Sequence, residues 1–208
     1  LFLEELPGQV KNLRPALQVS LESRQALLLI FIHALFLAGD ALHVVAGTGI
    51  DLDDVTLFDE APEMSIEAIT DMVIDKIHDQ TCPFIFANFP NVDVVGHIEN
   101  EQAVIRAVEA VDRCTGLVID EILKAGMCCI VTADHGTVEK WFYPDGAIDT
   151  GHTDSPVPFI LIHPAQQLTL RHGGGLTDIA PTVLELMGIP KPQRMTGRSL
   201  VELHRAEG

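Results

Sequence analysis

The fold of this protein is decided by residues 127–136, which read MCCIVTADHG. Five apolar residues in a row predict a strand that is covered on both faces, as in a parallel sheet. Asp134 and His135 follow directly, and Gly136 allows a turn sharp enough for both side chains to face one cavity. Burying a lone carboxylate costs several kcal/mol unless it is paired or coordinated, so this placement indicates a functional site. The alternative is that Asp134 caps a following helix at residues 137–140.

A second apolar run lies upstream, at residues 84–89, which read FIFANF and are stopped by Pro90. Asp93 and His97 follow it, and their spacing of four places both side chains on one face if this segment forms a helical turn. The alternative is a loop aspartate that caps the next helix, with a surface histidine beside it. Because ligands bind beyond the carboxyl ends of parallel strands, both polar pairs are expected at one edge of the sheet.

Two amphipathic helices are predicted around these strands. The first begins after Ser65 as its N-cap and ends near Asp79, and the second runs from about Glu101 to Lys124 and is ended by Gly126. Their apolar stripes are Ile66, Ile69, Val73 and Ile77 in the first, and Val104, Val108, Val111, Val118 and Ile122 in the second. Alternating strands and helices predict an α/β fold, with a parallel-type sheet and helices on both faces.

The C-terminal part continues this pattern. We expect a third strand at residues 157–162, a helix at residues 176–187 and a short closing helix at residues 200–204. Gly173–Gly175 is expected to be a flexible turn, because it lacks the strand, loop, helix and lysine of a phosphate-binding loop. Arg194–Arg198 is expected to be a surface loop.

The N-terminal part is less regular. Residues 26–38 are apolar apart from His33 and are expected to be buried as either a strand or a helix. Residues 40–59 are expected to be a loop with at most one short strand. No repeat or second domain boundary is visible, so residues 1–208 are expected to form one domain.

Composition excludes some function classes. Thirty acidic residues stand against 13 basic ones, a net charge of −17, which argues against nucleic acid and against an anionic membrane surface. Residues 26–38 are shorter than the roughly 20 residues that span a bilayer. Residues 1–6 carry two glutamates and no basic region, so no secretory signal is predicted. The cysteines lie in apolar runs without metal-type spacing, which predicts buried, reduced thiols in a cytoplasmic protein.

His152 is the fifth candidate ligand, in a loop that precedes Pro156–Pro158. Carboxylate oxygen and imidazole nitrogen are the donors that Mn²⁺ or Zn²⁺ prefers. The five candidates are too many for one catalytic zinc ion, and one short of two ions with three protein ligands each. They are Asp93, His97, Asp134, His135 and His152.

These motifs resemble, in order, those of the cofactor-independent phosphoglycerate mutases of the alkaline phosphatase superfamily. The matching segments are residues 88–97 (NFPNVDVVGH), 107–112 (AVEAVD), 132–136 (TADHG), 152–153 (HT), 156–158 (PVP), 176–182 (LTDIAPT), 188–190 (GIP) and 195–200 (MTGRSL). The resemblance covers residues 61–200, whereas residues 1–60 match the family poorly. It implies an alkaline-phosphatase-like three-layer sandwich, truncated at its N-terminus, that interconverts 3-phosphoglycerate and 2-phosphoglycerate in glycolysis.

The resemblance also implies two divalent metal ions, Mn²⁺ first and Zn²⁺, Co²⁺ or Mg²⁺ as alternatives. Asp93, His97 and His152 look like ligands of one ion, and Asp134 and His135 like ligands of the other. The family completes the second ion with an aspartate and the serine nucleophile, both from an N-terminal segment that has no match in this sequence. The second site is therefore expected to be incomplete.

The serine nucleophile of the family also has no match here. Ser20, Ser23, Ser65 and Ser155 do not stand in the family's sequence context. The arginine-rich domain that holds phosphoglycerate in the family is not matched either, and Arg24 corresponds only loosely to a family lysine. Little or no mutase activity is expected of this chain alone. The alternatives are a metal-dependent phosphohydrolase, in which one ion activates water, and a non-catalytic remnant that keeps the fold and binds metal weakly or acts as a partner module.

Overall fold

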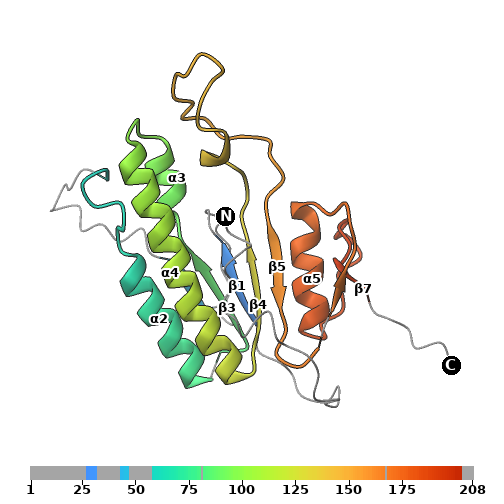
Figure 1. The fold of residues 1–208 in the computed structure, drawn as a ribbon. Coiled ribbons are helices and arrows are strands. Elements are labelled where there is room, and N and C mark those ends of the chain that lie inside the picture. Colours follow the sequence, from blue (N-terminus) through green and yellow to red (C-terminus); the bar gives the residue numbers. More distant parts are fainter. Residues whose placement is uncertain (1–26, 32–42, 47–57, 81, 167, 203–208) are drawn as a thin grey trace.

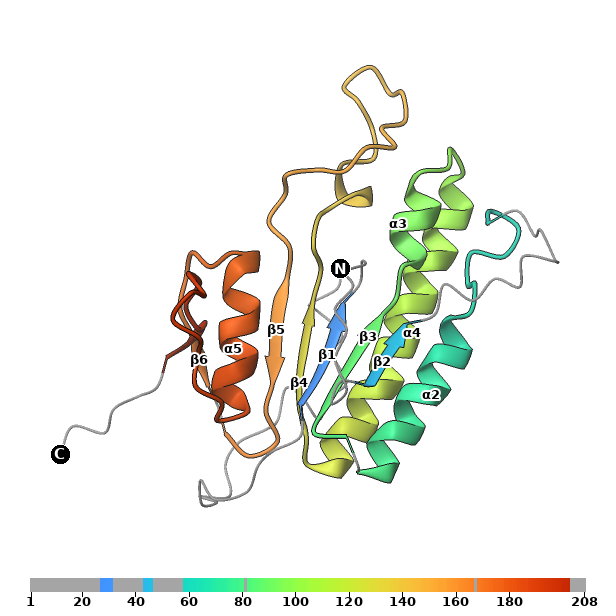
Figure 2. The same cartoon turned by 180° about the vertical axis from the view of Figure 1, so that it is seen from behind.

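The computed structural model describes residues 27–31, 43–46, 58–80, 82–166 and 168–202. These residues form a central sheet with helices on both of its faces (Figures 1 and 2). Predictions for residues 1–25, for most of residues 32–59 and for residues 203–204 lie outside the described part of the chain.

The central sheet has five strands in the order β2-β3-β1-β4-β5. The strands are β1 (Leu27–Phe31), β2 (His43–Ala46), β3 (Phe84–Asn88), β4 (Cys128–Thr132) and β5 (Phe159–Ile162). β1 is paired in parallel with both β3 and β4, with Phe31 in register with Asn88 and Thr132. The carboxyl ends of β3, β1 and β4 therefore meet at one edge. The apolar run at residues 26–38 is predicted to be either a strand or a helix, and β1 shows that its first part is a strand.

β5 departs from the parallel pattern, because it runs antiparallel to β4 with Thr132 opposite Phe159. A parallel neighbour needs a crossover connection, usually a helix. Between β4 and β5 the described chain has only a three-residue 3₁₀ helix, η1 (Val138–Lys140), so the chain returns as an antiparallel neighbour. The sheet is mostly parallel, as predicted, and its last strand is antiparallel.

The two long helices begin and end within one residue of their predicted boundaries. They are α2 (Ile66–Asp79) and α4 (Glu101–Ala125). The side chain of Asn100 accepts a hydrogen bond from the backbone N–H of Ala103 and so caps the start of α4. Gly126 ends it in the left-handed conformation (φ 69°) and donates its N–H to carbonyls of the last turn. Ser65 occupies the N-cap position of α2 without a capping hydrogen bond from its side chain.

Two apolar cores cover the two faces of the sheet. The larger one packs α2, α3 (Asn91–Gly96) and α4 on one face, and the smaller one packs α5 (Ile179–Leu186) on the other. Side chains of β4 alternate between them: Cys129 and Val131 face the first core, and Cys128 and Ile130 face the second. This double burial explains the unbroken apolar run in the sequence.

All four cysteines are buried and none forms a disulfide, as predicted. Burial raises the pKa of the Cys128 thiol to about 11 and that of Cys129 further still. Both thiols are therefore protonated near neutral pH, and they behave as small apolar core residues.

A second, two-stranded sheet closes the C-terminal part. β6 (Thr169–Leu170) pairs antiparallel with β7 (Val201–Glu202). The predicted closing helix at residues 200–204 is therefore wrong at residues 201–202, because backbone pairing with a segment some 30 positions earlier overrides the local preference. The predicted helix at residues 176–187 begins as a 3₁₀ turn, η2 (Leu176–Asp178), before α5.

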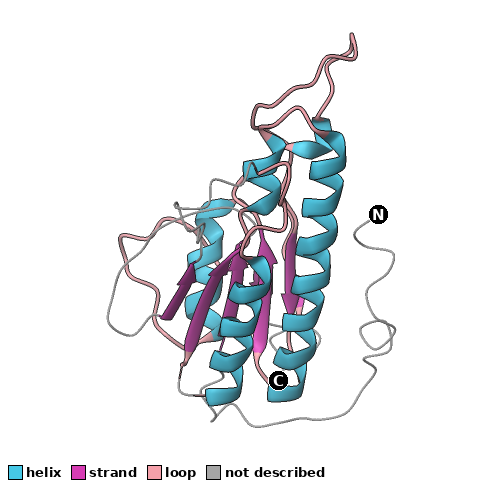
Figure 3. Cartoon of the chain, turned by 90° about the vertical axis from the view of Figure 1, so that its left-hand side faces the viewer, coloured by secondary structure: helices cyan, strands magenta, loops and turns pink. Residues whose placement is uncertain are grey.

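The long connection between β4 and β5 projects beyond the carboxyl edge of β4, at the top of Figure 1 and again in Figure 3. The polar segments that follow β3 and β4 therefore collect at one end of the sheet.

Among the described helices, none is both long enough and apolar enough to cross a lipid bilayer.

Candidate metal centre

Asp93 and His97 lie on the short helix that follows β3. α3 runs from Asn91 to Gly96 with His97 at its C-cap, so the condition that this segment forms a helical turn is confirmed. The Asn91 side chain anchors the helix by donating to the carbonyls of Pro62 and Glu63 at 2.9 and 2.7 Å. Asp93 Oδ1 then lies 3.3 Å from His97 Nε2.

His152 joins this pair from the long connection before β5. Its Nε2 lies 3.2 Å from Asp93 Oδ1 and 3.2 Å from His97 Nε2. The three ligand atoms all lie within 4.8 Å of one another. Asp93 Oδ1 is shielded from solvent, whereas the two histidine side chains are 45% and 48% exposed, so the cluster is open on one side.

A hydrogen bond fixes the orientation of the His97 ring. Its Nδ1 lies 2.6 Å from the carbonyl oxygen of Thr150, which can only accept, so Nδ1 carries the proton and donates. The lone pair of Nε2 then faces Asp93 and His152. A second ring nitrogen held by a carbonyl is the usual outer support of a metal-bound histidine.

The donor set fits a divalent metal ion. One carboxylate oxygen and two imidazole nitrogens converge, and these are the donor atoms that borderline divalent metal ions take in proteins. Three protein ligands with an open position are the usual arrangement of a catalytic metal site. The residues present therefore fit a divalent cation such as Zn²⁺ or Mn²⁺.

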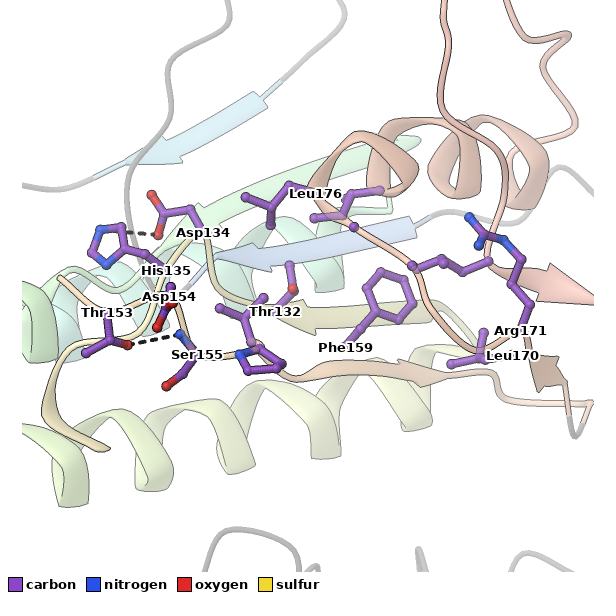
Figure 4. Close-up of a pocket in the computed structure, with 16 residues that line it drawn as sticks. Thr132, Asp134, His135, Thr153, Asp154, Ser155, Phe159, Leu170, Arg171 and Leu176 are labelled. Carbon is purple, nitrogen blue, oxygen red and sulfur yellow. Dashed lines mark hydrogen bonds and ion pairs between the residues drawn. The ribbon is translucent and has the colours of Figure 1, made fainter. Parts of the chain in front are cut away.

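Asp134 and His135 lie beside this triad, at the end of β4. His135 Nε2 is 3.9 Å from Asp93 Oδ1 and 3.8 Å from Asp134 Oδ1, and its ring stacks on that of His152 at 3.6 Å between centroids. Figure 4 shows Asp134 and His135 facing each other. The structure thus brings all five predicted residues to one edge, with His135 between the two carboxylates.

The structure excludes the alternatives in which Asp134 or Asp93 caps the following helix. The N-cap of η1 is Thr137, not Asp134, and the N-cap of α4 is Asn100, not Asp93. Both aspartates instead direct a solvent-shielded oxygen toward His135.

A cavity of about 470 Å³ lies against the Asp134/His135 side of the cluster (Figure 4). Asp134, His135 and Ser155 line one end, and Arg171 lies at the other. The wall between them is apolar and consists mainly of Val157, Phe159, Leu170, Leu176, Ile179 and Leu200. The sequence context of Ser155 does not match the family nucleophile, and Arg171 has no local sequence signal, because the pairing of β6 with β7 brings it to this cavity.

Asp178 holds the far wall of this cavity. Its carboxylate accepts hydrogen bonds from the backbone of Arg198 at 2.8 Å and of Gly175 at 3.1 Å, and from the Arg171 guanidinium at 2.5 Å. The hydrogen bond from Arg198 above all, with those from Gly175 and Arg171, holds the pKa of Asp178 below its ordinary value against the opposing effect of burial. The Gly173–Gly175 turn is therefore anchored at one end.

Two other described histidines, His163 and His78, have structural settings. His163 Nδ1 accepts hydrogen bonds from the backbone N–H groups of Ala165 and Gln166, and burial lowers its pKa. His78 pairs with Glu121 on the outer surface of α2 and α4. Neither takes part in the cluster.

Comparison with known proteins agrees with this geometry. The chain is 46% identical over 149 residues to the 2,3-bisphosphoglycerate-independent phosphoglycerate mutase of Syntrophotalea carbinolica, and 47% identical over 155 residues to that of Rhodopirellula baltica. These alignments cover 72% and 74% of this chain but only 29% and 28% of the relatives. The chain thus spans less than a third of the length of the curated relatives that it matches.

A solved structure shows the same arrangement of elements. The phosphoglycerate mutase of Leishmania mexicana, crystallised at low cobalt concentration, superposes with a TM-score of 0.66 at 29% identity, over 72% of this chain and 30% of that one. The predicted alkaline-phosphatase-like α/β fold is confirmed. A family model described as the Metalloenzyme superfamily matches residues 41–191, which is most of the chain. The chain therefore belongs to the Metalloenzyme superfamily.

Proposed function

We propose that Asp93, His97 and His152 bind one divalent metal ion, and that this chain is the metal-binding part of a phosphoryl-transfer enzyme of the phosphoglycerate mutase type. The observation that carries the proposal is the convergence of the three ligand atoms within 4.8 Å. The names of the relatives and the cobalt in the Leishmania mexicana crystals support it. Mn²⁺ is the ion we propose first, with Zn²⁺, Co²⁺ or Mg²⁺ as alternatives.

Asp134 and His135 are proposed as the part of a second metal site that this chain supplies. A divalent ion bound at this centre would act as a Lewis acid toward a phosphoryl oxygen and lower the pKa of an oxygen nucleophile. His135 presents Nε2 to Asp93 and Asp134, and its Nδ1 lies 3.2 Å from the carbonyl of Gly136. Both residues also line the cavity, which makes it the proposed location of the phosphorylated substrate.

The substrate that we propose is a small phosphorylated metabolite, phosphoglycerate, in the glycolytic interconversion of its 3- and 2-isomers in the cytoplasm. The proposal concerns the whole enzyme, since this chain spans less than a third of its relatives. The catalytic nucleophile remains unassigned in this sequence. We accordingly propose that the isolated chain binds metal and catalyses little or no isomerisation.

Isothermal titration of Mn²⁺ into the chain tests the metal centre. The wild-type chain is expected to bind Mn²⁺, and His152→Ala is expected to lose that binding. His78→Ala is the matched control, because His78 pairs with Glu121 away from the cluster. Equal binding by wild type and His152→Ala would remove the proposed centre, and no binding by either would leave only the non-catalytic remnant.

A metal-dependent phosphohydrolase is the second candidate. It is favoured by the half-exposed histidines of the triad, which leave the proposed ion open to water without any serine. Hydrolysis of p-nitrophenyl phosphate with Mn²⁺ decides between the two. Turnover that disappears in His152→Ala would support it, whereas turnover no higher than in that variant would exclude it.

A further inference from the structure

We infer that Glu139 is a positioning residue of the metal centre, whose carboxylate ties the segment carrying His152 to the end of β4 that carries His135. The inference rests on the proposed metal-binding function and assigns a role to a residue outside the ligand set. Glu139 lies on η1 and is exposed to solvent, so its side chain does not contribute to the packing of the core.

The carboxylate of Glu139 joins the two segments directly. Oε2 accepts a hydrogen bond from the backbone N–H of Thr137 at 2.8 Å, and Oε1 accepts one from the Thr153 hydroxyl. The backbone N–H of Ser155 in turn donates to Thr153 Oγ1 at 3.3 Å. Thr137 lies two positions after His135, and Thr153 follows His152 directly. The Glu139 side chain is therefore hydrogen-bonded to both segments that carry proposed ligands, and we call these hydrogen bonds the clamp.

The backbone beneath the carboxylate is built for this approach. Gly136 and Thr153 form an antiparallel bridge, in which the N–H of Thr153 donates to the carbonyl of Gly136 at 2.9 Å. A Cβ added at Gly136 would overlap both Glu139 Oε1 and Thr153 Oγ1. Only glycine at position 136 therefore lets the carboxylate lie over the crossing point of the two segments.

His152 needs such an anchor because burial does not hold it. Its side chain is 48% exposed, and the segment that carries it is part of the long connection after η1. Fixing a flexible segment at the moment of metal binding costs conformational entropy, and a tether formed in advance lowers that cost. Hydrogen bonds to an ionised carboxylate are about twice as strong as neutral ones.

Glu139 is charged at neutral pH. Burial raises its pKa, but the hydroxyls of Thr153 and Ser155 and backbone N–H groups lower it by more, and the pKa is held below its ordinary value. Among the described residues, the clustered ligand atoms are those of Asp93, His97 and His152 and do not include this carboxylate. Glu139 therefore acts through Thr153 and not as a ligand.

Mn²⁺ titration of matched variants tests this role. Glu139→Gln removes the charge and one of the two acceptor oxygens, and Thr153→Val removes the donor hydroxyl. Each variant is expected to weaken Mn²⁺ binding about ten-fold, within the range typical of outer-shell partners. Thr153→Ser keeps the hydroxyl and is expected to bind as the wild type does. Lys140→Gln is the control, because it removes the exposed Lys140–Asp154 ion pair between the same two segments without touching the carboxylate.

Two further measurements separate positioning from general stability. The double variant Glu139→Gln/Thr153→Val is expected to bind no more weakly than either single variant, since both remove one shared hydrogen bond. In the metal-free protein, the NMR ring signals of His152 are expected to shift in Glu139→Gln while those of His78 stay unchanged. This readout does not depend on metal.

The outcomes distinguish this inference from the proposed function. If wild type fails to bind Mn²⁺ but the His152 signals shift in Glu139→Gln, the clamp stands and the metal centre fails. If wild type binds and Glu139→Gln binds equally well with unchanged His152 signals, the inference is overturned and the metal centre stands.

Discussion

The Nε2 atoms of His97 and His152 lie 3.2 Å apart, although 55 positions separate the two residues in the chain. His97 directs its proton-bearing Nδ1 to the Thr150 carbonyl, so the nitrogen that faces His152 carries a lone pair. Asp93 Oδ1 lies 3.3 Å from one of these nitrogens and 3.2 Å from the other. One carboxylate oxygen and two imidazole nitrogens at this spacing fit the donors that a divalent cation takes. The predictions below follow from that fit and from the contacts around it.

Asp93→Asn is expected to weaken Mn²⁺ binding by more than about 100-fold, because it removes the only carboxylate of the triad, whereas outer-shell partners contribute about 10–100-fold. Metal at 100 times its Kd stabilises a binding-competent chain by about 2.7 kcal/mol. Thermal unfolding with and without Mn²⁺ should therefore show a metal-induced rise in Tm for wild type and none for the variant. An equal rise in both would contradict the assignment of Asp93.

Gly136→Ala is expected to weaken Mn²⁺ binding and to lower the free energy of unfolding, because the added methyl group displaces the Glu139 carboxylate and the Thr153 hydroxyl. Gly116→Ala is the control: it lies in α4, and a Cβ there meets no atom within 4 Å. That change should stabilise the helix by up to about 1 kcal/mol. Urea unfolding and Mn²⁺ titration of both variants measure the contrast. Unchanged metal binding by Gly136→Ala would argue against the close approach.

Asp178→Asn is expected to lower the free energy of unfolding by about 1–3 kcal/mol at pH 7, because partly buried donors from Arg171, Arg198 and Gly175 lose a charged acceptor. The pKa of Asp178 is lower in the folded protein than its ordinary value of 3.8. Its contribution to stability is therefore present above that value and is lost as the pH falls through the lower, folded pKa.

The pH dependence of this effect is measured by urea unfolding between pH 7 and pH 3. The difference between wild type and Asp178→Asn should shrink as the pH falls below about 4. A difference that stays constant over this range would mean that the ionised carboxylate is not what stabilises the far wall of the cavity.

The isolated chain is expected to convert 3-phosphoglycerate to 2-phosphoglycerate at no more than a trace rate, because no serine in the nucleophile context of the family has been identified in it. A coupled assay with Mn²⁺ measures this. Conversion that EDTA abolishes would overturn the expectation and would require a nucleophile within these 208 residues.

Local patterns were sufficient for the elements that carry the site. The apolar runs before Asp93 and Asp134 predicted β3 and β4. A strand that is covered on both faces has a nearly continuous apolar sequence, whereas a strand with one solvent face alternates apolar and polar residues. The α4 boundaries followed from periodicity and from Gly126, which leaves the helix in the left-handed conformation. Asp93, Asp134 and His135 are conspicuous in the sequence because polar residues follow these buried strands. His152 lies in a loop and has no such local signal.

Which strands pair, and in which direction, was decided only by the tertiary structure. The antiparallel direction of β5 and the pairing of β6 with β7 depend on backbone partners far away in the chain, which no local pattern encodes. The insertion of β1 between β3 and β4 is of the same kind.

The residues of the centre are therefore a property of the sequence, and their arrangement is a property of the fold. The sequence by itself determined that carboxylates and imidazoles follow the strands, because residue type and burial pattern are local. Only the folded chain decided that His135 lies between Asp93 and Asp134, that its ring stacks on His152, and that Glu139 reaches Thr153 over Gly136. Those contacts join segments that only the packing of the whole sheet brings within hydrogen-bond distance.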